Sequence, residues 1–106
     1  MLENSGKDFV DSVAREFKNA IELFVNKNAQ YGADDPLANF RAGALLEEGV
    51  DTWSAMYNEA RAYSRKHIAQ VYGKGKNIET PKVEESLADI MVYSAIMLYM
   101  WGKHQE

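Results

Sequence analysis

The chain lacks cysteine and has little proline. None of its 106 residues is cysteine, so disulfides and thiolate metal sites are excluded, and the composition is compatible with a reducing cytosol. The two prolines, Pro36 and Pro81, each lie where a helix would begin. Alternating runs of valine and isoleucine, which are typical of β-strands, are also missing. These absences favour an all-α chain.

Long apolar runs and a strong net charge are missing as well. The longest apolar run, residues 90–101, is shorter than the roughly 20 residues that cross a bilayer. The first residues show no basic region followed by an apolar run, so we expect no secretory signal. The net charge is −4 with both signs scattered, which disfavours general nucleic-acid binding. We expect a cytoplasmic protein with a single domain over residues 1–106.

Apolar residues at helical spacing predict an antiparallel bundle of four helices. Their expected spans are about 6–26, 36–48, 52–72 and 81–103, the second being short. Asp35 and Asp51 are the expected N-caps of the second and third helices, and Gly49 is the expected end of the second. The first helix carries an apolar stripe that should bury against the rest of the chain. Its members are Phe9, Val10, Val13, Phe17, Ala20, Ile21 and Phe24.

The stretch 80–101 predicts a long final helix with protein on both sides. One side is an ordinary core stripe that includes Val83, Leu87 and Leu98. The opposite side begins with Glu85 and Asp89, one turn apart, and then becomes apolar. Carboxylates on a covered face are costly without a positive partner. We therefore expect either a divalent cation or a basic side chain beside this pair.

These acids are the candidate catalytic and metal-binding residues. Two carboxylates one turn apart can share a hard cation such as Mg²⁺, which usually takes one or two carboxylates together with water and substrate phosphates. Glu48, Asp51 and Glu59 are further candidate ligands, provided that the helices bring them to Glu85 and Asp89. The alternative is that Glu48 and Asp51 only mark a helix end and a cap, and that Glu85 favours the positive end of a helix.

A further catalytic candidate, Lys66, comes from the third helix, and the substrate-binding candidates come from the polar segment 27–40. Lys66 lies on the same side as Glu59, where it can counter a carboxylate or reach a phosphate; the alternative is a solvated lysine. Lys27, Tyr31 and Asn39 offer a cation, a ring for stacking on a base and an amide that can read the base edge. The alternative is a plain loop whose tyrosine packs on the bundle.

The sequence offers no zinc site and none of the common catalytic signatures. His67 falls on the apolar face of the third helix, which predicts a structural histidine, and no second histidine stands at ligand spacing for zinc. Signatures of a P-loop, of a dinucleotide-binding turn and of nucleophilic catalysis are missing.

Four short motifs carry a resemblance to a known group of proteins. They are YG at Tyr31, DDPLANF at 34–40, KHI at 66–68 and ESLADIMVY at 85–93. In this order they resemble small phage and prophage proteins similar to the nucleotide modification associated domain and, more distantly, to the MazG-like all-α nucleoside triphosphate pyrophosphohydrolases. The resemblance covers roughly residues 27–98.

The resemblance implies an all-helical fold, oligomers formed through helix faces and, in the catalytic members, a Mg²⁺ cluster held by acids from two helices. Such a cluster cleaves a nucleoside triphosphate to the monophosphate and pyrophosphate. Glu85 and Asp89 match the second acid motif, and Glu48 with Asp51 can match the first. The chain departs from the enzyme pattern because the second pair is spaced E-x-x-x-D rather than E-x-x-D, and because Gly49 interrupts the first motif.

Two functional hypotheses follow. The first is a Mg²⁺-dependent nucleotide pyrophosphohydrolase in which Glu85, Asp89 and other acids hold the metal while Lys66 or Lys27 contacts phosphates. The second is a non-catalytic phage-type helical oligomer that binds a nucleotide or a host protein. In that case the acids pair with basic side chains, and the apolar segment from Ile96 to Trp101 is an interface between copies.

Overall fold

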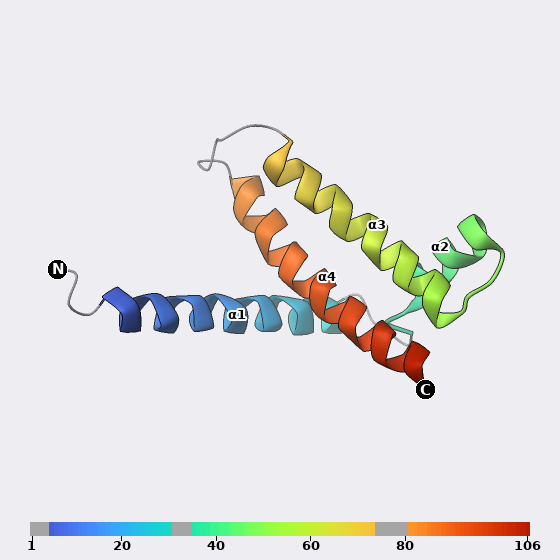
Figure 1. Cartoon of the computed structure of the whole chain (residues 1–106), viewed down its shortest axis with the longest axis horizontal. Coiled ribbons are helices and arrows are strands. Elements are labelled where there is room, and N and C mark those ends of the chain that lie inside the picture. The colour runs from blue at the N-terminus through green and yellow to red at the C-terminus, as the bar shows by residue number, and fades with distance from the viewer. Residues whose placement is uncertain (1–4, 31–34, 74–80) are drawn as a thin grey trace.

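A computed structural model describes residues 5–30, 35–73 and 81–106, and its four elements are all α-helices (Figure 1). They are α1 (Ser5–Gln30), α2 (Ala38–Glu48), α3 (Trp53–Tyr72) and α4 (Pro81–Gln105). The predicted all-α architecture with a short second helix is confirmed. α1 continues past its expected end at residue 26, and α2 begins at Ala38 rather than at residue 36. None of the described helices has an apolar stretch long enough to cross a membrane.

The core lies where α2, α3 and α4 meet. α3 and α4 run antiparallel along most of their length, and α2 packs against α3 (Figure 1). Small side chains allow these helices to approach closely, and partly buried aromatic and aliphatic side chains surround them. The fully packed cluster consists of Ala44, Ala55, Met56, Ala60 and Met100.

The ends of α2 and α3 are defined by local hydrogen bonds. Thr52, not Asp51, caps α3, because its Oγ1 accepts a hydrogen bond from the amide of Ala55 at 3.2 Å. The prediction that Asp51 is this cap is therefore wrong. Gly49 ends α2 as predicted: its φ of 76° lies in the left-handed region, and its N–H donates to the carbonyl of Leu45 at 3.0 Å.

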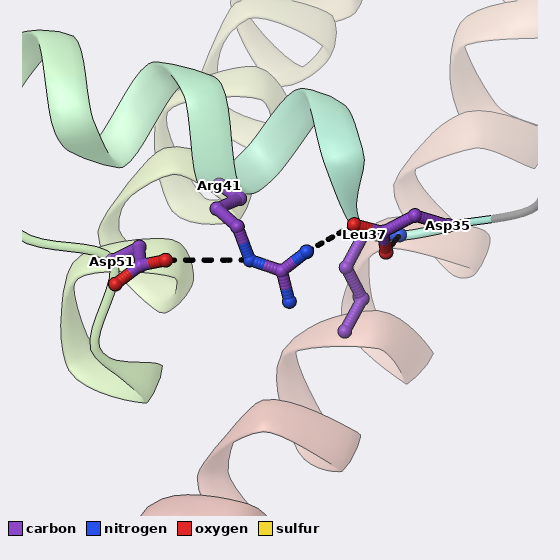
Figure 2. Close-up of polar contacts among 4 residues, drawn as sticks. All are labelled: Asp35, Leu37, Arg41 and Asp51. Carbon is purple, nitrogen blue, oxygen red and sulfur yellow. Dashed lines mark hydrogen bonds and ion pairs between the residues drawn. The ribbon is translucent and has the colours of Figure 1, made fainter.

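Arg41 connects the two ends of α2 (Figure 2). Its guanidinium forms an ion pair with Asp35 before the helix, and its Nε lies 3.4 Å from Oδ2 of Asp51 after it. Asp35 also accepts a hydrogen bond from the amide of Leu37 at 3.0 Å. A planar guanidinium can serve two carboxylates at once, so this residue fixes both connections of a short helix.

α1 is the element whose packing differs most from expectation. Among the described helices it contacts α4 alone, near its own C-terminal end, and its N-terminal part stands clear of the other three (Figure 1). Ala20 is buried, but the six large members of the predicted stripe remain exposed, with Phe9 at 68% and Ile21 at 62%. The prediction that this stripe buries within its own chain is wrong, because α1 crosses α4 at one end and most of the stripe lies beyond that crossing.

Candidate functional site

Asp89 lies where side chains from α1 and α3 reach α4. Its side chain is 25% exposed, and Nζ of Lys27 lies 3.8 Å from its Oδ1. On the other side, Nε2 of His67 lies 3.7 Å from its Oδ2. Asp89 is therefore a partly covered carboxylate between a lysine and an imidazole that come from two different helices.

Aromatic rings extend this site along α4. Tyr93, one turn after Asp89, stacks on His67 with ring centroids 5.6 Å apart and on Tyr63 with centroids 5.9 Å apart. Phe40 of α2 meets the rings of both tyrosines edge-on, with centroids 6.2 and 6.4 Å away. Such offset-stacked and edge-to-face pairs hold rings in fixed orientations. We call Phe40, Tyr63, His67 and Tyr93 the aromatic cluster.

The environment of Tyr93 keeps its phenol neutral. Burial raises the pKa of Tyr93 above its usual value of 10.0, and the negative charge of Asp89 and then the neighbouring Tyr63 raise it further. The Tyr93 hydroxyl, which like any phenol is protonated at neutral pH, therefore keeps its proton and its capacity to donate a hydrogen bond to higher pH than an exposed tyrosine does.

His67 brings an unsatisfied polar atom to the same place. Its Nδ1 is buried and finds no hydrogen-bond partner among the described residues, while its Nε2 faces Asp89. Leaving a buried polar atom without a partner is costly, and a bound molecule or water that supplies one would remove the cost. The site therefore combines a carboxylate, a cation, stacked rings and a free position on an imidazole.

The other predicted metal ligands at the helix ends are exposed or contact residues other than Asp89. Glu85, one turn before Asp89, is exposed, so the prediction that both carboxylates lie on a covered face is wrong for Glu85. Glu48 contacts Nδ2 of Asn58 at 3.4 Å, and Asp51 pairs with Arg41. In the part of the chain that the structure describes, no three side chains of His, Asp or Glu come close enough together to hold a metal ion.

Glu59 has a different environment from the acids at the helix ends. It is partly buried on α3, and its carboxylate lies against α2 at Gly43, where an added Cβ would be only 2.5 Å from Oε2. The absence of a side chain at Gly43 thus makes room for this carboxylate.

The predicted substrate-binding residues and the catalytic candidate Lys66 have different surroundings. Lys27 lies at Asp89, whereas Lys66 and Asn39 are exposed on α3 and α2. Tyr31 falls outside the described residues. The structure therefore brings Lys27 to the candidate site.

Sequence reasoning did not assign the aromatic cluster a role. The apolar face of the third helix predicts a structural role for His67, and the sequence predictions assign no function to Tyr63 or Tyr93. A signal was available, since Asp89 with Tyr93 and Tyr63 with His67 are pairs one turn apart on two helices expected to be antiparallel neighbours. The spacing of residues within each helix does not, however, determine the relative register of the two helices.

Comparisons with known proteins do not add to this geometry. A scan against protein-family models gives no match, and searches of curated proteins and of solved structures give none either. The geometry around Asp89 and the motifs of the sequence therefore remain the only indications of function.

Proposed function

We propose that this protein binds a nucleoside triphosphate together with Mg²⁺ at Asp89 and hydrolyses it to the monophosphate and pyrophosphate, in the cytoplasm and in the manner of the MazG-like enzymes. The observation that carries the proposal is the partly covered carboxylate of Asp89, which lies between Lys27 and His67. Both canonical and modified nucleotides are candidate substrates.

In this proposal, different side chains contact the phosphates, the Mg²⁺ and the base of the nucleotide. Lys27 is 54% exposed at its side chain, so it can leave Asp89 and contact phosphate oxygens, and Asp89 with Glu85 then face the Mg²⁺ that the nucleotide brings. Lys66 is a second candidate phosphate contact. Tyr31 and Asn39 remain the proposed contacts to the base.

The proposed reaction is a simple hydrolysis. A water oxygen forms a bond to the α-phosphorus, the bond from that phosphorus to the α,β-bridging oxygen breaks, and pyrophosphate leaves with the electron pair. The protons of the water pass to solvent or to the products. Positive charge from Lys27 near the phosphates favours the transition state, because phosphoryl transfer depends mainly on positioning and charge neutralisation.

Two features limit the likeness to the enzymes. Gly49 ends α2 immediately after Glu48, so Glu48 and Asp51 do not share a helix. Asp51 is also held by Arg41. Asp89 accordingly has the principal role in the proposed pyrophosphohydrolase, and Glu48, Asp51 and Glu59 have secondary roles.

The test is an assay of product formation. The protein is incubated with Mg²⁺ and a panel of canonical and modified deoxynucleoside triphosphates, and monophosphate and pyrophosphate are quantified. We expect Asp89→Asn to lower the rate by at least about a hundredfold, as when a group that stabilises transition-state charge is removed. Glu84→Gln, a matched change at an exposed acid in the first turn of α4, should leave the rate unchanged. Absence of pyrophosphate from the wild-type protein with every nucleotide would exclude hydrolysis.

A specific observation also favours a second function, that of a helical oligomer that binds a nucleotide or a host protein without turnover. Leu98 and Trp101 of the segment 96–101 are 71% and 57% exposed. Apolar side chains grouped in this way are typical of an interface. Binding of a nucleotide without product formation, by a protein with at least twice the mass of one chain, would support this alternative.

A further inference from the structure

Two apolar surfaces of this chain have no cover among its described residues. The first is the stripe of α1 formed by Phe9, Val10, Val13, Phe17, Ile21 and Phe24, all of them exposed. The second is a groove of about 320 Å³ on α3 and α4, lined by Tyr57, Ser94, Met97, Leu98 and Trp101. We call these the α1 stripe and the α4 groove.

The α1 stripe belongs to a helix that needs a partner. Its apolar residues recur at helical spacing, and its charged residues occupy the opposite face. Isolated helices are marginal in water, and most of their stability in proteins comes from covering such a face. The N-terminal part of α1 nevertheless stands clear of α2, α3 and α4 (Figure 1). Something outside this set of helices must therefore cover it.

We propose that the α1 stripe of one copy of this chain packs into the α4 groove of a second copy, and the reverse. The proposal rests on the suggestion that segment 96–101 is a contact between copies, and it names the occupant of that contact. A projecting helix with aromatic side chains and an apolar hollow are complementary in shape and chemistry. Because each copy carries both, two copies can close a symmetric pair in which every stripe and every groove is filled.

The apolar area fits a stable dimer. The six stripe side chains leave roughly 600 Å² exposed, taking about 200 Å² for a large side chain fully in water. A standard interface buries about 800 Å² on each partner. Leu98 and Trp101, at 71% and 57% exposed, supply the remainder from the groove. The two surfaces together therefore provide about the area that a specific dimer requires.

The charge on α1 disfavours a lipid surface as the occupant. Helices that lie on anionic membranes are rich in lysine and arginine on their polar face. Between residues 5 and 24, α1 instead has three basic residues, Lys7, Arg15 and Lys18, against four acids, Asp8, Asp11, Glu16 and Glu22. A second copy, by contrast, offers a matching apolar surface of suitable size.

The experiment places a photoreactive benzophenone amino acid at Phe17 and mixes ¹⁴N- and ¹⁵N-labelled protein before irradiation. Benzophenone reacts readily with methionine side chains, and Met97 lines the groove. We expect cross-linked peptides of mixed isotope composition that join residue 17 to Met97 or its neighbours in the groove. The same amino acid at Glu22, on the polar face of α1, is the matched control and should give a yield several-fold lower.

The outcomes separate this inference from the proposal on which it rests. A wild-type protein with the mass of one chain at micromolar concentration would contradict both. A dimer in which residue 17 cross-links elsewhere would overturn the stripe-in-groove arrangement and leave segment 96–101 open as an interface.

Phe17→Ala should raise the dissociation constant of the dimer by roughly thirtyfold or more, whereas Arg15→Ala should not. Since Phe17 is 54% exposed in one chain, its truncation tests association rather than folding.

Discussion

At the scale of single residues, the ionisation of Tyr93 reports on Asp89. Burial is the larger cause of its raised pKa, and the charge of Asp89 is the second. Asp89→Asn should therefore lower the pKa of Tyr93 while leaving it above 10, because the burial remains. The measurement is the ultraviolet absorbance of tyrosinate against pH, taken as the difference between each protein and its Tyr93→Phe counterpart. Equal pKa values in the two backgrounds would show that Asp89 does not face this ring.

The raised pKa of Tyr93 also predicts how the stability of the fold changes at high pH. The folded state holds the proton of Tyr93 more tightly than the unfolded state does, so this contribution to stability is complete below pH 10. It is lost as the pH rises through the raised pKa of the folded protein. Tyr93→Phe removes the titrating group, so the free energy of unfolding of this variant should fall less steeply above pH 10 than that of the wild type.

Lys27 should matter more for binding than for stability. Its ion pair with Asp89 is partly exposed at a separation of 3.8 Å, and such pairs contribute about 0.2 to 1 kcal/mol. Lys27→Ala should therefore change the free energy of unfolding in urea by less than about 1 kcal/mol and still weaken binding of a triphosphate. Lys18→Ala, about two and a half turns away on the opposite face of α1, is the control. Equal nucleotide affinity in the two variants would show that Lys27 does not contribute to nucleotide binding.

At the scale of helices, two glycines should respond oppositely to alanine. Gly49 has a φ of 76°, where a Cβ is strained, so Gly49→Ala should lower stability by about 1 kcal/mol. Gly102 lies inside α4 with open space around the position of a Cβ, so Gly102→Ala should raise stability by about 0.5 to 1 kcal/mol. Chemical denaturation of both variants measures the difference, and two shifts of the same sign would contradict this account of the end of α2.

Arg41 should determine how firmly α2 is held. Its guanidinium serves Asp35 and Asp51 together, and a lysine cannot reproduce that two-sided geometry. Both Arg41→Lys and Arg41→Ala should therefore destabilise the fold by about 1 kcal/mol, the order expected for partly exposed charged contacts. Hydrogen exchange should speed up in α2 and not in α4. A lysine variant as stable as the wild type would show that one ion pair is sufficient.

The helices could be predicted from sequence more fully than their contacts. The apolar spacing gave four helices, and Gly49 gave the end of α2, because both signals are local. The observed cap of α3 is one residue later than the predicted one, because Asp51 and Thr52 are both good caps and Arg41, ten residues earlier, pairs with the aspartate. His67 and Lys27 could not be placed at Asp89, because that contact depends on how α1 and α3 are positioned on α4.

At the scale of the whole molecule, the exposed α1 stripe and the site at Asp89 are connected through one helix. α1 carries Lys27 to Asp89 near its C-terminal end and the uncovered stripe towards its N-terminal end. Anything that fixes α1, a second copy above all, would also fix the position of Lys27. Dilution below the dissociation constant of the dimer should therefore lower the affinity for a triphosphate, as measured by fluorescence of a labelled analogue. An affinity independent of protein concentration across that range would separate the two features.

The most direct test of the account is to map where a nucleotide binds. A non-hydrolysable triphosphate analogue with Mg²⁺ is titrated into isotope-labelled protein, and chemical shifts are followed by NMR. We predict the largest changes at Lys27, His67, Asp89 and Tyr93, with little change at Arg41 and Asp51, and loss of these changes in Asp89→Asn. Saturating analogue that leaves the signals of the four residues unmoved would contradict the claim that this protein holds a nucleotide at Asp89.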